Sequence, residues 1–201
     1  MIFNYTNKYQ FTTRLSVNNH PIEVIKSTRL VCTIVQDDLC WDLNTKEIVR
    51  KANARMELLR KVAAFCDNQE ELRNIYILFV RSILEQSATV WHSSLSKDNR
   101  NDLERVQKTA LKVIMGQKYH SYRNALNKLN LENLNERREN LCLTFAQRTS
   151  NHQTMKKMFP LNKKTCKMIT RNPERFKVQC ALNERLKNSP IIYMQNLLNR
   201  S

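Results

Sequence analysis

The sequence contains a single glycine, Gly116, among its 201 residues. Glycine-rich loops that cradle phosphates, of the Walker type or the dinucleotide-binding type, each need several glycines, so the sequence excludes both. An all-β fold with many tight turns is disfavoured for the same reason. The prolines lie at positions 21, 160, 173 and 190, which leaves residues 22–159 free of proline and open to long helices.

The stretch Leu72–Trp91 is the best candidate for a central element. It carries only three charged residues, and apolar residues occupy every side of the helix that it would form. A helix that is apolar all round must be covered all round. We therefore expect one buried central helix, in which Phe79 and Trp91 are both largely buried.

The stretch Asp98–Gly116 predicts an amphipathic helix that ends at its glycine, because glycine takes the left-handed cap conformation at little cost. Apolar residues at helical spacing predict its inner face: Leu103, Val106, Ala110, Val113 and Ile114. Three cations lie on the opposite face: Arg105, Lys108 and Lys112.

Four further helices are predicted. The first begins at a capping pair, Asn44 and Glu47, and carries Lys46, Arg50 and Lys61 on the face opposite its apolar stripe. A short helix near Ser121–Leu129 follows the glycine. The next covers Leu134–Thr149, with an inner face of Leu134, Leu141, Phe145 and Ala146. The last begins at Ser189-Pro190, since proline is favoured at the first helical position.

Residues 11–35 have the pattern of strands. Apolar and polar residues alternate on both sides of Asn18-Asn19, and asparagine tolerates the positive φ of a tight hairpin turn. The run Leu30–Val35 is typical of a buried strand. We predict an α+β, mainly α fold. It comprises a small N-terminal antiparallel sheet over residues 1–40, a helical bundle over 41–150, and a basic, partly irregular tail over 151–201.

The formal net charge of +16 favours a polyanion as partner, nucleic acid first and an acidic membrane surface second. Residues 151–201 hold eleven Lys and Arg against two Glu, a balance of +9. The basic helix faces either hold phosphates or are simply solvated. Tyr119 and Tyr122 either stack on bases or pack over a helix end.

No cofactor, metal or small-molecule substrate is predicted. None of the six cysteines has a C-x-x-C neighbour, and a zinc site from the tail lacks a fourth ligand. Asp37-Asp38 has the residue type of a magnesium-binding pair, but turn or helix-entry aspartates are the favoured interpretation. The chain has no apolar N-terminal segment and no run long enough to span a bilayer, so an intracellular protein, nuclear or cytoplasmic, without a membrane partner is expected.

An ordered series of short motifs over residues 26–199 resembles the C-terminal part of the reverse transcriptase of non-LTR (LINE-type, jockey-like) retrotransposons. The central motif is Leu103-Glu104-Arg105-Val106-Gln107-Lys108-Thr109-Ala110, which is followed by Ile114-Met115-Gly116. Before it stand Trp41, Lys51-Ala52-Asn53, Arg60, Phe79-Val80-Arg81-Ser82-Ile83-Leu84-Glu85 and Val90-Trp91. After it stand Tyr119, Tyr122, Ala125-Leu126, Leu129, Leu131, Arg137-Arg138, Phe159-Pro160 and Thr170-Arg171-Asn172.

The resemblance implies a fragment that comprises the end of the palm and the thumb of an RNA-directed DNA polymerase. The catalytic aspartates of the family would precede it, so the chain is expected to be no enzyme by itself. Its partners would be RNA or an RNA–DNA hybrid and a palm and fingers domain. Near Arg29–Thr33, where the family has a primer-grip turn, Val31-Cys32 replaces a usual Leu-Gly pair, which suggests a decayed or domesticated copy.

The residues expected to contact nucleic acid are Arg50, Lys61, Arg105, Lys108, Lys112, Arg137 and Arg138. The alternative is a helical protein-interaction module, or a decayed relic of the element, with no nucleic-acid role. Under that interpretation the cations only keep the domain soluble.

Overall fold

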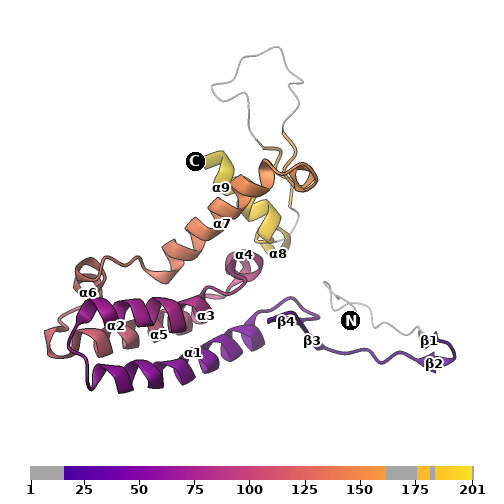
Figure 1. The fold of residues 1–201 in the computed structure, drawn as a ribbon. Coiled ribbons are helices and arrows are strands. Elements are labelled where there is room, and N and C mark those ends of the chain that lie inside the picture. The colour runs from indigo at the N-terminus through magenta and orange to yellow at the C-terminus, as the bar shows by residue number, and fades with distance from the viewer. Residues whose placement is uncertain (1–15, 162–175, 182–183, 201) are drawn as a thin grey trace, which may run out of the picture.

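The computed structural model describes residues 16–161, 176–181 and 184–200 (Figure 1). Two small antiparallel sheets near the N-terminus precede a long helical region, which confirms the predicted mainly α fold. Figure 1 shows the first hairpin lying apart from the helices, while the second lies against the start of the first helix.

The hairpins confirm one predicted turn and correct one predicted strand. Strands β1 (Ser16–Val17) and β2 (His20–Pro21) pair across Asn18 and Asn19, whose φ angles are 49° and 65°. The predicted single strand Leu30–Val35 is wrong, because the chain reverses within it. Strands β3 (Ser27–Leu30) and β4 (Thr33–Gln36) pair across a two-residue loop.

Val31 occupies the first position of that loop with φ 56°, and its side chain is 95% exposed. Since Cys32 has no positive φ, this is the backbone pattern of a type II′ turn, in which glycine is preferred at the first position. A β-branched residue there strains the backbone. The strained position is Val31, whereas the Leu-Gly pair of the resemblance would have its glycine at position 32, where φ is not positive.

The first helix, α1 (Asp42–Ala63), begins two residues before the predicted capping pair. Asn44 is buried and does not cap the helix; its Oδ1 accepts a hydrogen bond from Ile34 N at 3.0 Å. This bond ties β4 to the first turn of α1. Of the predicted apolar stripe, Ile48, Ala52, Met56 and Leu59 are buried, and Ala63 is half-buried.

The predicted central helix is divided into short pieces. It comprises α2 (Gln69–Ile75), the π-helical turn η1 (Tyr76–Arg81), α3 (Ser82–Leu84), α4 (Ala88–Trp91) and the 3₁₀ turn η2 (His92–Ser94). Ser87, with φ 54°, separates α3 from α4. Asn68 caps the start of α2, because its side chain accepts a hydrogen bond from Glu70 N.

A buried row explains the π-helical turn. Its members recur every four residues: Leu72, Tyr76, Val80 and Leu84. In an α-helix, four residues turn about 400°, so such a row drifts by about 40° at each step. The wider π-helical turn cancels this drift and keeps all four side chains on the side of α1 and α5.

The opposite side of this segment is uncovered, so the prediction of a helix buried all round is wrong. Trp91 is fully buried, as predicted, but Phe79 is 44% exposed and Leu78 is 66% exposed. Between residues 74 and 90, the exposed side chains are Asn74, Leu78, Phe79, Ser82, Ser87 and Val90, none of them charged.

Helix α5 (Lys97–Met115) packs along α1 and ends at Gly116, the predicted position. The φ of Gly116 is positive at 51°, but its ψ of −128° differs from the left-handed cap conformation that was predicted. Ser96 caps its start by accepting from Asn99 N. The predicted inner face is buried, apart from the half-buried Val113. The turn η3 (Gly116–Lys118) leads to α6 (Tyr122–Lys128), which is the predicted short helix.

Helix α7 (Leu134–Ser150) runs from one core to another. Leu134 belongs to the large core of α1, α2, α5 and α6, whereas Cys142 and Ala146 pack with Phe159, Met194 and Leu197. Phe145, predicted to point inward, is exposed instead.

Helix α9 (Pro190–Arg200), which follows α8 (Glu184–Lys187), supplies Met194 and Leu197 to the second core. The turn η4 (Met155–Met158) lies beside α7 and contributes no buried residue itself, but leads into the buried Phe159. Helix α9 begins at the proline as predicted. The expectation of an irregular tail falls largely on residues 162–175, which lie outside the described residues.

The two leucines of this segment form a matched pair for stability. We expect Leu84→Ala to lower the free energy of unfolding by roughly 2–5 kcal/mol, because it leaves a cavity in a fully buried row. Leu78→Ala, the same change on the exposed side, should cost less than about 1 kcal/mol. Urea unfolding measures both, and equal losses would contradict the one-sided packing.

Candidate nucleic-acid interface

From Arg105 in α5 through η3 to α6, the chain carries several cations and no acidic residue between them. Residues 105–131 contain six Lys and Arg and no Asp or Glu. All six are exposed: Arg105, Lys108, Lys112, Lys118, Arg123 and Lys128. We call this set the α5–α6 cationic stretch. Three of its members were predicted as phosphate contacts, and the other three were missed although the absence of acids is visible in the sequence.

Two lysines of the stretch lie over tyrosine rings. Lys108 Nζ is 5.2 Å from the centre of the Tyr122 ring, and Lys112 Nζ is 5.7 Å from that of Tyr119. A cation over an aromatic face is attracted by the ring quadrupole. Both tyrosines are half-buried, so of the two sequence interpretations the structure favours packing over a helix end rather than free platforms for bases.

A buried hydrogen-bond chain lies beneath this surface. Tyr76 Oη donates to Gln107 Oε1 at 2.6 Å, and Gln107 Nε2 donates to Tyr122 Oη at 2.9 Å and to the carbonyl of Glu132 at 2.9 Å. Tyr122 Oη in turn donates to Glu104 Oε1. Burial, and then the Glu104 carboxylate, raise the pKa of Tyr122, which keeps its hydroxyl protonated.

The remaining predicted cations differ in how far nearby acids neutralise them. Arg105 is exposed but pairs with Asp102 at 3.0 Å. On α1, Arg50 Nε lies 2.8 Å from Glu47 Oε2, and Lys51 and Arg29 also pair with this carboxylate. The Arg50 hydrogen bond is the main cause that lowers the pKa of Glu47 to about 2.

The α1 surface is therefore of mixed charge, since Arg60 also pairs with Glu57. Lys61 is exposed and makes no ion pair within the described residues. The Glu47–Arg50 pairing was foreseeable from the three-residue spacing of the two side chains. The α5–α6 cationic stretch is consequently the stronger candidate for phosphate contacts.

The adjacent arginines of α7 do not join this surface. Arg137 is half-buried and pairs with Glu85 at 3.2 Å. Arg138 is fully buried, which leaves no part of its guanidinium accessible to a phosphate, and we remove it from the predicted contacts. The physical reason is its position on the inner face of α7, four residues after the buried Leu134 and four before the buried Cys142.

Arg138 is only partly satisfied in its buried site. Its Nε donates to His92 Nδ1 at 3.3 Å and its guanidinium lies over the Trp91 ring, but its two terminal nitrogens have no hydrogen-bond partner among the residues that the structure describes. Burial lowers the pKa of Arg138 to about 10. Burial, and then the charge of Arg138, lower the pKa of His92 to about 3, so His92 is neutral.

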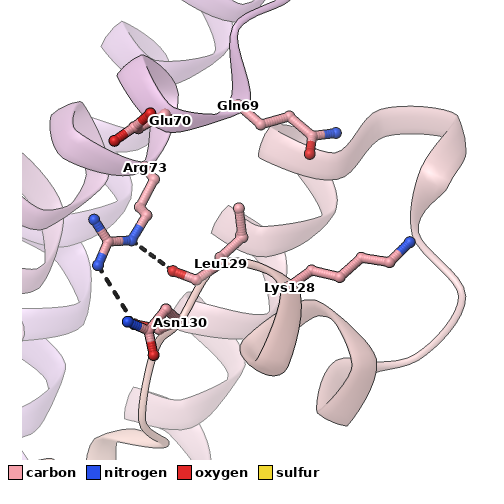
Figure 2. Close-up of a pocket in the computed structure, with 6 residues that line it drawn as sticks. All are labelled: Gln69, Glu70, Arg73, Lys128, Leu129 and Asn130. Carbon is pink, nitrogen blue, oxygen red and sulfur yellow. Dashed lines mark hydrogen bonds between the residues drawn. The ribbon is translucent and has the colours of Figure 1, made fainter.

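A pocket of about 360 Å³ lies between α2 and the end of α6 (Figure 2). Its lining includes Gln69, Glu70, Arg73 and Lys128. Arg73 Nε donates to the carbonyl of Leu129 at 2.6 Å, and its Nη2 donates to that of Asn130 at 3.4 Å. These bonds satisfy carbonyls at the end of α6, so Arg73 anchors the last turn of the cationic stretch to α2.

The other chemical candidates are not assembled into sites. Asp38 Oδ1 accepts from Cys40 N at 2.8 Å, which is the geometry of a turn aspartate. Among the described residues, no three His, Cys, Asp or Glu side chains lie together as metal ligands would. None of the helices described is long and apolar enough to cross a membrane.

No family model, no curated protein and no solved structure matches this chain.

The unpaired guanidinium yields a stability prediction. Arg138→Met keeps the length and apolar stem of the side chain but removes a buried charge with two unsatisfied nitrogens. We expect the free energy of unfolding to stay unchanged or to rise by up to about 4 kcal/mol. Arg137→Met, which breaks an ion pair instead, is the control. A loss of more than about 3 kcal/mol for Arg138→Met would contradict this account.

The neutral His92 yields a pH prediction. An unfolded histidine titrates near 6.5, so below that pH the unfolded chain binds a proton that the folded chain does not bind until about pH 3. Stability is therefore lost as the pH falls through this window, by up to about 1.4 kcal/mol per pH unit.

His92→Gln keeps a hydrogen-bond acceptor but cannot be protonated, so its stability should fall less steeply between pH 6 and about pH 3 than that of the unaltered protein. His120→Gln, at an exposed histidine, should leave the unaltered slope. Chemical denaturation at several pH values measures the difference, and parallel curves for all three proteins would contradict the assignment.

Proposed function

We propose that this chain binds the phosphate backbone of nucleic acid through the α5–α6 cationic stretch. The observation that carries the proposal is the run of six exposed cations without an acid between residues 105 and 131. Phosphate contacts release condensed counterions, which favours binding at low salt whatever the base sequence. Lysines that already rest on tyrosine rings lose less side-chain freedom when they meet a phosphate.

The resemblance to non-LTR retrotransposon reverse transcriptases indicates which nucleic acid to test. If the resemblance holds, Glu104, Lys108 and the two tyrosines belong to a thumb-like segment. We therefore propose that the chain is a thumb-like fragment of an RNA-directed DNA polymerase that holds an RNA–DNA hybrid. Its contribution would be binding and not nucleotide transfer, since Asp38 is engaged in a turn.

A second candidate function rests on a different surface. The exposed side of η1 and its neighbours carries Leu78 and Phe79, and none of the exposed side chains between residues 74 and 90 is charged. Charged residues are depleted at the centres of protein interfaces. A helical protein-interaction module, without a nucleic-acid role, would use this face. Nucleic-acid binding requires the cations of the α5–α6 cationic stretch, whereas the protein-interaction module does not.

The test removes two charges without changing helix propensity much. We expect Lys108→Gln/Lys112→Gln to weaken binding to an RNA–DNA hybrid and to reduce the slope of log K against log salt by about 1.8, since each phosphate contact accounts for about 0.9. Fluorescence anisotropy at several salt concentrations measures this slope. The loss should be the same for hybrids of different sequence.

A charge-matched control separates a local contact from the general effect of net charge. Lys46→Gln/Arg55→Gln also removes two exposed cations, from α1, and should change the slope little. If the two double variants lost the same affinity and the same salt slope, the weakening would be explained by net charge alone and not by a local phosphate contact. Unchanged affinity and slope in Lys108→Gln/Lys112→Gln would favour the protein-interaction module.

A further inference from the structure

Tyr122 contacts both Lys108 of the cationic stretch and Glu104, the acid four residues before Lys108. We propose that Tyr122 is a positioning residue that keeps the charge of Lys108 free for a phosphate by sequestering Glu104. The proposal rests on the nucleic-acid function proposed above and names the residue on which one of its contacts depends.

The sequence itself favours a different pairing for Lys108. Glu104 stands four residues before Lys108 on α5, and a glutamate in that position is the preferred helical partner of a lysine. Such a pair would neutralise the cation next to the binding surface. In the structure this ion pair does not form, and Lys108 makes none within the described residues.

Tyr122 comes between the two partners. Its hydroxyl, from α6, donates to Glu104 Oε1, and the face of its ring lies beneath Lys108 Nζ at 5.2 Å. The same carboxylate oxygen also accepts from Leu134 N at 3.4 Å. Glu104 is thus held on the inner side of the surface by two donors, while Lys108 is held on the outer side by the ring.

The buried chain fixes the direction of this hydroxyl. Gln107 Oε1 is occupied by Tyr76, so Gln107 presents its Nε2 to Tyr122, and the Tyr122 oxygen accepts there. The phenolic proton is then left to point at Glu104. Successive donors run from Tyr76 through Gln107 and Tyr122 to a carboxylate, an arrangement in which each bond polarises the next.

The experiment removes only the hydroxyl. Tyr122→Phe keeps the ring but releases Glu104, which is then free to pair with Lys108. We expect this variant to bind an RNA–DNA hybrid roughly tenfold more weakly at about 50 mM salt. The slope of log K against log salt should fall by about 0.9, as it should for Lys108→Gln.

Tyr119→Phe is the matched control. Its ring lies under Lys112, its hydroxyl makes no hydrogen bond within the described residues, and four residues before Lys112 stands a lysine.

Two double variants separate positioning from a general structural role. Adding Tyr122→Phe to Lys108→Gln should cause no further loss, because Tyr122 acts through Lys108. Adding Glu104→Gln to Tyr122→Phe should restore affinity and slope, since an uncharged amide cannot neutralise the lysine. A loss that adds to that of Lys108→Gln, or that Glu104→Gln does not reverse, would overturn the proposal.

The outcomes distinguish this inference from the proposed function. If the unaltered chain does not bind the hybrid, the proposed function fails. If it binds and Lys108→Gln weakens binding while Tyr122→Phe does not, only the inference fails.

Discussion

One buried amide, that of Gln107, joins most of the helical region. It is fully buried, and its partners come from η1, from α6 and from the loop that precedes α7. An apolar side chain in its place would leave the Tyr76 hydroxyl without its hydrogen-bond acceptor and would remove one donor each from the Tyr122 hydroxyl and the Glu132 carbonyl, in a low-dielectric interior. The π-helical turn belongs to the same constraint, because it keeps Tyr76 in the buried row, from which its hydroxyl reaches Gln107.

The net charge of each surface of this molecule depends on the acids that lie next to its cations, rather than on the number of cations. Glu47 faces three basic side chains on and beside α1, whereas no acid stands between Arg105 and Glu132. Glu104, the one acid positioned to neutralise the centre of the stretch, is turned inward by Tyr122. The two basic faces that look alike in the sequence therefore present different surfaces.

Features fixed by a single residue type were predictable from the sequence. Gly116, Pro190 and the Asn18-Asn19 pair each mark a boundary where the backbone demands that residue. The π-helical turn and the break at Ser87 were not predictable, because an all-round apolar pattern does not show which side will be covered. The turn at Val31 was hidden for a related reason: a β-branched residue is an unfavourable choice for positive φ, so the pattern indicated a continuous strand.

The site was predictable only in part. The basic face of α5 followed from its spacing, but the charge of Arg50 is neutralised by Glu47, three residues before it, and Arg138 lies on the inner face of α7. For Arg138 the signal was present, since Leu134, Arg138, Cys142 and Ala146 recur every four residues and three of them are small or apolar. The role of Tyr122 was out of reach, because it depends on how α6 crosses α5.

Helix α7 belongs to two cores of unequal size, and this has a consequence for how the protein opens. Its first turns are held by the large core, while its second half is held through Cys142 and Ala146 by Phe159 and a few residues of α9. Cooperative units with few buried contacts open at lower free energy than the whole. Amide hydrogens should therefore exchange in steps along this one helix, fast in its second half and slow in its first, so that α9 can leave and return while the cationic stretch stays folded.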